Sequence, residues 1–216
     1  MSCLGDAVSY FSKYRMKVNG IIHVGAWHGD EIVDYISNGI KHIAWFEPQA
    51  RCQEPLLKWQ EPYADKANIT IHPVALGNSN TEMEMNICNQ FDMTSSLLEP
   101  SDIFYGEHPE LKDKFTKEKV EVYRLDEYDD INHVDYNCLA MDTQGYELEV
   151  LKGATDTLEL IDYIFTEISN TELYKGTALI EDLDEFLTPR GFKRVETNWQ
   201  GTGTWGDAFY IREKLL

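Results

Sequence analysis

Two kinds of hydrophobic pattern alternate along the chain. Short runs rich in β-branched and aromatic residues are separated by segments that are apolar on one helical face. This alternation is typical of α/β folds, in which crossover helices join the strands of a sheet. The expected strands are 20–24, 42–46, 69–74, 138–141, 163–166, 192–195 and 208–212. The expected helices cover 31–36, a segment around 56–59, 146–152 and 179–187. The pattern predicts a doubly wound α/β sheet of about seven strands.

The alternation loosens between Thr81 and Tyr123. Residues 82–87 alternate as an edge strand does, and residues 101–119 are charged and loop-like. No linker or internal repeat interrupts the rest of the chain. We therefore interpret 1–216 as one domain and 81–123 as an insertion over the rim of the sheet.

Charge narrows the choice of partners. The chain has 216 residues, with 19 Lys and Arg against 38 Asp and Glu, so the formal net charge is −19. Affinity for nucleic acid comes mainly from Lys and Arg that neutralise phosphates, so nucleic acid is not an expected partner. An anionic membrane surface would also repel this chain.

The cysteines give no sign of a metal or disulfide framework. Cys3, Cys52, Cys88 and Cys138 lie far apart, without a CxxC pair or a histidine at ligand spacing. We expect reduced thiols, as in a reducing compartment. No signal-peptide pattern and no run of about 20 apolar residues is present. The expected location is cytoplasmic.

The ends of the first two expected strands carry residues suited to a nucleoside. Ligands of open parallel sheets bind outside the carboxyl ends of the strands. Gly25 and Gly29 follow the first strand and permit a tight turn close to a ligand, although a generic strand-to-helix turn would look the same. Glu47 ends the second strand, where a carboxylate can accept both hydroxyls of a ribose. Together these two ends predict a nucleoside-binding fold.

The first turn favours one kind of nucleoside. It lacks the GxGxxG pattern of dinucleotide-binding proteins. A pyrophosphate would also lie poorly beside Asp30 and Glu31. S-adenosylmethionine, which has a ribose and a cationic sulfonium, suits these acidic surroundings better.

The stretch 142–153, Asp-Thr-Gln-Gly-Tyr-Glu-Leu-Glu-Val-Leu-Lys-Gly, is the most informative in the chain. Shorter matches occur in order at 23–26 (His-Val-Gly-Ala), 46–48 (Phe-Glu-Pro), 75–77 (Ala-Leu-Gly), 95–97 (Ser-Ser-Leu) and 166–167 (Thr-Glu). With these motifs the chain resembles the FkbM family of S-adenosylmethionine-dependent methyltransferases from about residue 20 to 212. The resemblance implies a class I methyltransferase fold, Rossmann-like and mostly parallel with an antiparallel last strand. It also implies methyl transfer to a hydroxyl of a sugar, glycan or polyketide-like small molecule.

The resemblance also implies roles for the strand-end residues. Gly25, Ala26 and Gly29 would line the methionine end of the cofactor, Glu47 its ribose, and Ala75 and Leu76 its adenine. Many family members have Asp where this chain has His23, which either contacts the amino-acid end of the cofactor or is a core histidine. The expected cofactor-binding residues are His23, Gly25, Ala26, Trp27, Gly29, Glu47, Pro48, Ala75 and Leu76.

Asp142 and Glu167 are the expected catalytic residues, because both follow strands that reach the cofactor cleft. An alcohol must lose its proton, and Asp142 would be the base or would orient the acceptor. Alternatively, the two carboxylates hold Mg²⁺, or Asp142 caps the next loop. Glu147 is expected on the first turn of a helix, where its negative charge would interact favourably with the helix dipole. The expected acceptor-binding residues are Ser95, Ser96, Gln144, Tyr174, Lys175, Trp205 and Asp207, with a core role as the alternative for the tryptophan.

Two other functions stay open from sequence. One is an NAD(P)- or sugar-nucleotide-binding oxidoreductase, against which the missing third glycine and the lack of a Tyr-x-x-x-Lys pair argue. The other is a non-catalytic module that binds the cofactor, as His23 in place of Asp would suggest. The identity of the acceptor and the oligomeric state are not determined by these patterns.

Overall fold

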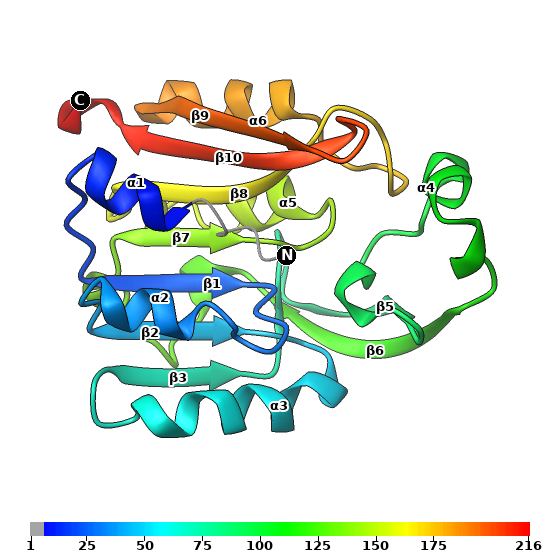
Figure 1. Cartoon of the computed structure of the whole chain (residues 1–216), viewed down its shortest axis with the longest axis horizontal. Helices are drawn as coiled ribbons and strands as arrows, with labels where there is room; N and C mark the ends of the chain where they lie inside the picture. The colour runs from blue at the N-terminus through cyan, green and yellow to red at the C-terminus, as the bar shows by residue number, and fades with distance from the viewer. Residues whose placement is uncertain (1–6) are drawn as a thin grey trace.

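A seven-stranded sheet forms the centre of the molecule (Figure 1). The computed structural model describes residues 7–216. The strands of this sheet are β1 (Gly20–Val24), β2 (His42–Phe46), β3 (Asn68–His72), β7 (Cys138–Met141), β8 (Tyr163–Ser169), β9 (Phe192–Gln200) and β10 (Trp205–Arg212). Their order is β3-β2-β1-β7-β8-β10-β9, and β10 runs antiparallel to both of its neighbours. The predicted mostly parallel sheet with an antiparallel last strand is confirmed.

The strand order places a crevice between β1 and β7. From β1 the chain winds outward to β2 and β3, and then returns to β7 on the other side of β1. At such a switch point the connections leave in opposite directions, so the carboxyl ends of β1 and β7 open toward a ligand. The motifs at 25–29 and 142–147 both begin there.

Alternation along each strand builds a core on both faces of the sheet. Ile21, Ile43 and Trp45 face the side covered by α1 (Ala7–Lys13), α2 (Ile32–Ser37) and α3 (Ala50–Gln60). Ile22 and Phe46 face the side covered by α5 (Glu147–Lys152) and α6 (Ile180–Leu187). Because both faces are covered, the central strands are apolar at nearly every position, as expected for parallel sheets.

One helix buries a different line of residues from the one predicted. Leu56, Leu57 and Trp59 were expected on the buried side of α3, but Leu57 is 59% and Trp59 49% exposed. The helix instead buries Cys52, Leu56 and Gln60, which are spaced by four residues. Since α3 runs beside the edge strand β3 (Figure 1), the sheet covers only one narrow line of its surface.

Residues 81–123 form most of a second, three-stranded sheet, ordered β4-β6-β5. Its strands are β4 (Ala75–Leu76), β5 (Thr81–Cys88) and β6 (Phe115–Tyr123), and a short helix, α4 (Asp102–Glu107), joins the last two. Figure 1 shows this part beyond the arrowheads of the parallel strands, where it overhangs their carboxyl ends. That it is a rim insertion within a single domain stays a prediction.

The loop expected at 101–119 is wrong, because this stretch contains α4 and much of β6. The Ser101 hydroxyl accepts hydrogen bonds from the backbone N–H groups of Ile103 and Phe104 and so caps α4. The strand was hidden by its charge, since exposed residues of β6 such as Lys117 and Lys119 pair with glutamates of β5.

The structure bears in part on the expectations of reduced thiols and of no membrane-spanning segment. Cys52, Cys88 and Cys138 carry free thiols, whereas Cys3 lies outside the described residues. Within residues 7–216, no helix is long and apolar enough to cross a membrane.

Candidate active site

The turn after β1 depends on a glycine for close approach to a neighbouring loop. Gly25 has φ of +81°, and a Cβ there would lie 1.9 Å from the carbonyl oxygen of Asp142. The N–H groups of Gly25 and Ala26 donate to the carbonyl of Phe46 at the end of β2. The turn is thus fixed between the ends of β2 and β7.

Glu47 lies at the centre of this edge of the sheet and is 2% exposed. Its Oε2 accepts the N–H of Trp27 at 2.9 Å, and its Oε1 accepts the N–H of Gln49 at 2.8 Å. Burial raises the pKa of this carboxyl to about 7 although both bonds favour the charged form. Backbone hydrogen bonds use one lone pair on each oxygen, and the roughly four lone-pair sites of a carboxylate leave room for a ligand hydroxyl as well.

A cleft, here termed the inner cleft, opens above these residues. Of the expected cofactor-binding residues, it is lined by Gly25, Trp27, Glu47, Pro48, Ala75 and Leu76. Ala26 is instead part of the core, and Gly29 packs against Leu56 and Gln60 of α3. The cleft is also lined by apolar residues that were not expected from the sequence, namely Met85, Met93, Leu97 and Tyr146. The period-two pattern of 82–87 was the available signal for Met85.

His23 is not among the lining residues of the inner cleft. It is 1% exposed, its Nδ1 lies 2.8 Å from the Tyr35 hydroxyl, and its ring packs against Trp45. Burial lowers the pKa of His23 to about 4, so the ring is neutral at physiological pH. These contacts favour the core-histidine interpretation.

Asp142 and Glu167 are joined by the side-chain amide of Gln144. Its Nε2 donates to Asp142 Oδ1 at 2.7 Å and to Glu167 Oε2 at 2.9 Å. The Tyr174 hydroxyl lies 3.0 Å from Gln144 Oε1 and 2.9 Å from the backbone carbonyl oxygen of Thr94. Burial raises the pKa of Asp142, and burial together with the neighbouring carboxylates raises that of Glu167 well above its ordinary value.

A second cavity adjoins the inner cleft and shares Met93, Asp142 and Gln144 with it. We term it the aromatic pocket. Its other lining residues include Phe91, Phe104, His108, Glu167, Tyr174 and Trp205. Phe104 and His108 were missed because 101–119 was expected to be a loop.

The other expected acceptor residues lie in varied positions. Ser95 lines the inner cleft. Ser96 is buried and donates to the backbone carbonyl of Gln144. Lys175 is on the surface and pairs with Glu99, and Asp207 lies opposite Glu167 in the register of β10 and β8. Lys175 and Asp207 line neither cavity.

Glu147 shapes the loop that carries Asp142 and Gln144. Its Oε1 accepts the N–H and the hydroxyl of Thr143, both at 2.8 Å, and the N–H of Gly145 at 3.2 Å. The loop includes two residues at positive φ, Gln144 and Gly145. The spacing of Asp142, Gly145 and Glu147 therefore has a structural reason, because the glutamate holds the turn in place.

The candidate metal ligands differ from those expected. In the described part of the chain, one group brings three potential ligands together, namely His28, Cys52 and Asp92. It includes neither Asp142 nor Glu167.

Comparisons with known proteins agree with this arrangement. The model of the methyltransferase FkbM domain matches residues 23–194. No curated protein matches the sequence significantly.

Several solved methyltransferase structures are similar along nearly the whole chain. Magnesium protoporphyrin IX methyltransferase from Synechocystis PCC 6803, with bound SAM, has a TM-score of 0.55 at 10% identity, covering 97% of this chain and 77% of that one. A putative tRNA methyltransferase from Streptococcus pneumoniae, in complex with S-adenosyl-L-methionine, has a TM-score of 0.54 at 12% identity, with coverage of 96% and 72%. A SAM-dependent methyltransferase from Aquifex aeolicus has a TM-score of 0.51 at 10% identity, covering 97% of this chain and 91% of that one.

At such low identity these structures show the fold, which is that of class I methyltransferases. The family model goes further, because it spans most of the chain and includes every strand end described above. The chain therefore belongs to the methyltransferase family defined by the FkbM domain.

Proposed function

We propose that this protein is an S-adenosylmethionine-dependent O-methyltransferase that acts on a hydroxyl of a sugar, glycan or polyketide-like small molecule. The observation that carries this proposal is the position of Asp142 and Gln144, which line both the inner cleft and the aromatic pocket. A carboxylate at that junction lies where a methyl donor in one cavity would meet a hydroxyl in the other.

The inner cleft has the groups that a nucleoside cofactor requires. Glu47 offers a buried carboxylate that can accept a hydrogen bond from a ribose hydroxyl. Gln49 Oε1 is buried without a hydrogen-bond partner among residues 7–216, so a donor such as an adenine amino group would satisfy it. Apolar residues, among them Leu76 and Leu97, flank the space for a flat base. Two similar structures hold this cofactor, which supports the same assignment here.

When bound, S-adenosylmethionine supplies an electrophilic methyl group on a positively charged sulfur. The chain's own part is then to align the acceptor oxygen with that methyl group and to remove the hydroxyl proton. Alignment of two bound reactants contributes on the order of 7–11 kcal/mol to lowering a barrier. The Gly25 turn and the loop at 142–145 fix the two cavities relative to each other through the contact of Gly25 with Asp142.

We assign Asp142 as the base. Burial and the charges of Asp142, Glu147 and Asp207 raise the pKa of Glu167 well above its ordinary value, so Glu167 is the weaker acid of the pair. Asp142 is then the carboxylate of the pair that ionises first. A positioned base typically accelerates a reaction about 10²- to 10⁴-fold.

Mg²⁺ between Asp142 and Glu167 is the alternative. The Nε2 of Gln144 donates to both carboxylates, so a cation there would have to displace this amide. That geometry favours proton transfer. Activity that survives EDTA treatment would support the base, whereas a loss that only added Mg²⁺ restores would support the cation.

The charges around the aromatic pocket support a small, neutral acceptor. Asp142 and Glu167 line it, and none of its lining residues is Lys or Arg. Aromatic faces such as those of Tyr174 and Trp205 suit the apolar side of a sugar ring. One similar structure is that of a putative tRNA methyltransferase, but the net charge of −19 disfavours an RNA substrate here.

Cofactor binding tests the assignment of the inner cleft. S-adenosylhomocysteine should raise the melting temperature of the protein, and NADH should not. Glu47→Gln, which keeps the shape of the side chain, should weaken S-adenosylhomocysteine binding in calorimetry. Glu54→Ala, an exposed carboxylate on the same side of the sheet, is the matched control. A shift with NADH alone, or wild-type affinity in Glu47→Gln, would contradict the assignment.

A further inference from the structure

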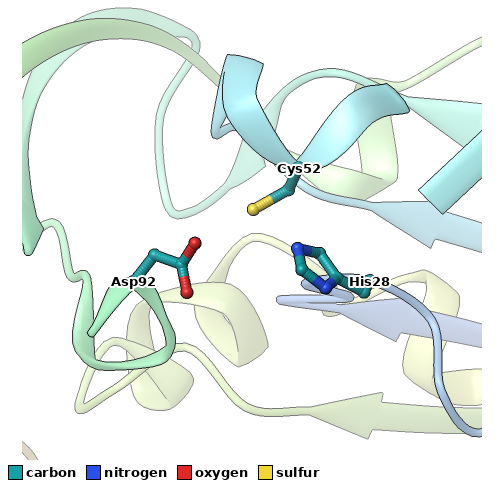
Figure 2. Close-up of side chains that lie close together, drawn as sticks. All are labelled: His28, Cys52 and Asp92. Carbon is teal, nitrogen blue, oxygen red and sulfur yellow. The ribbon is translucent and has the colours of Figure 1, made fainter. Parts of the chain in front are cut away.

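Three metal-ligating side chains from distant segments meet beside the inner cleft. His28 follows β1, Cys52 lies in the first turn of α3, and Asp92 begins a short helical turn within 81–123. Figure 2 shows the three side chains pointing toward a common space. One ligand atom from each lies within 4.8 Å of the others.

The chemical types of these three ligands favour some metal ions over others. A thiolate, an imidazole and a carboxylate are the ligands of Zn²⁺, whereas Mg²⁺ and Ca²⁺ take oxygen ligands. Zinc–ligand bonds of about 2.0–2.3 Å separate two ligands of a tetrahedral ion by roughly 3.5 Å. The ligand atoms would therefore move about 1 Å closer together when the ion binds. Rotation about the side-chain bonds allows a movement of this size.

Neighbouring groups already hold two of the ligands in position. The indole Nε1 of Trp27 donates to Asp92 Oδ1 at 3.0 Å, and the ring of Trp27 stacks on that of His28 with centroids 3.8 Å apart. The Gln49 amide donates to the backbone carbonyl of Asp92 at 3.3 Å. Such outer contacts orient metal ligands and are typical of built sites. The charge also balances, because a thiolate and a carboxylate together neutralise one divalent ion.

We propose that His28, Cys52 and Asp92 form a Zn²⁺ site with three protein ligands and a fourth position for water. The ion ties the segment around Asp92 to the loop after β1 and to α3. Trp27 and Met93, each next to a ligand in the chain, line the inner cleft. Zinc therefore fixes the wall of this cleft and has a structural role that is separate from the chemistry at Asp142.

Metal binding to the 216-residue chain tests this proposal without any cofactor. After removal of metal by a chelator, the wild type should take up about one equivalent of Zn²⁺ in competition with a chromogenic chelator. Co²⁺ should give the near-ultraviolet charge-transfer band of a thiolate ligand. Cys52→Ser should lose that band, and Cys88→Ser, which changes a buried thiol outside the group, should keep it. Asp92→Asn and His28→Gln should each weaken Zn²⁺ binding by about 100-fold or more, since even outer contacts are worth 10- to 100-fold.

Hydrogen exchange gives a second readout of the structural role. Zn²⁺ should slow amide exchange at residues 91–95 in the wild type and leave it unchanged in Asp92→Asn. Asp92 is partly exposed, so this variant should fold even if Cys52→Ser does not. Failure of the wild type to compete for zinc, or a cobalt band and zinc affinity that survive in the variants, would overturn the proposal. Because none of these readouts involves methyl transfer, the result is independent of the proposed function.

Discussion

Gln144 is the residue on which the geometry of the acids depends. Its amide donates to Asp142 and to Glu167, and both bonds lower the pKa of the carboxyl that accepts them. The backbone of Gln144 is held at φ of 56°, and Ser96 donates to its carbonyl. One side chain thus bridges the two acids and partly offsets the rise in their pKa values that burial causes.

Replacement of Gln144 should change the pH dependence of catalysis. In Gln144→Leu the two carboxyls lose their donor, so their pKa values rise and the base ionises only at higher pH. We expect the rising limb of kcat/KM to move to higher pH, with a kcat about 10-fold lower at pH 7. Gln90→Leu, on the exposed surface, is the control for the substitution itself. An unshifted pH profile in Gln144→Leu would show that the amide does not tune the base.

A comparison of Gly25 with Gly39 distinguishes the effect of a close backbone contact on stability from the effect of a positive φ alone. Both have φ near +80°, but a Cβ at Gly25 meets the Asp142 carbonyl at 1.9 Å, while nothing lies within 4 Å of one at Gly39. Gly39→Ala should therefore cost only about 1–2 kcal/mol of unfolding free energy, from the positive φ. Gly25→Ala should cost more, because backbone must also move. Urea unfolding measures both values, and equal losses would contradict the contact.

Secondary structure was predictable wherever burial dominates the sequence. The bounds of β1, β2 and β7 agree with the prediction because these strands are buried on both faces and read as continuous apolar runs. α4 and β6 could not be read in this way, since their exposed faces are charged and their apolar residues pack on partners from elsewhere in the chain. Phe104, for example, shares a cluster with Leu173 and Tyr174.

The cap of α4 provides a test of this element. Ser101→Ala removes the side-chain acceptor of two N–H groups, which should cost about 1 kcal/mol of unfolding free energy. Because α4 carries Phe104 and leads to His108, the KM for the acceptor should also rise, with little change in S-adenosylhomocysteine affinity. Ser79→Ala, at an exposed turn, is the matched control. If the affinity for S-adenosylhomocysteine fell by the same factor as the KM for the acceptor rose, α4 would not act on the aromatic pocket alone.

At the scale of the whole molecule, the site lies between the main sheet and the second sheet. The sequence motifs located the residues contributed by β1, β2, β7 and β8, because strand ends of a parallel sheet meet at one edge. They did not locate the part of the aromatic pocket that 81–123 contributes, which includes Phe91, Phe104 and His108. They also missed the group of His28, Cys52 and Asp92, whose members lie 52 − 28 = 24 and 92 − 52 = 40 residues apart, well outside any local ligand spacing.

Methyl transfer itself is the most direct test of the central claim. Wild type and Asp142→Asn would be incubated with labelled S-adenosylmethionine and a panel of neutral sugars and glycans alongside phosphorylated counterparts, with products read by mass. We predict a methyl ether on a neutral acceptor, at a rate that Asp142→Asn lowers about 10²-fold or more while it still binds S-adenosylhomocysteine. Transfer at the wild-type rate by Asp142→Asn, or no transfer to any hydroxyl by the wild type, would contradict the account.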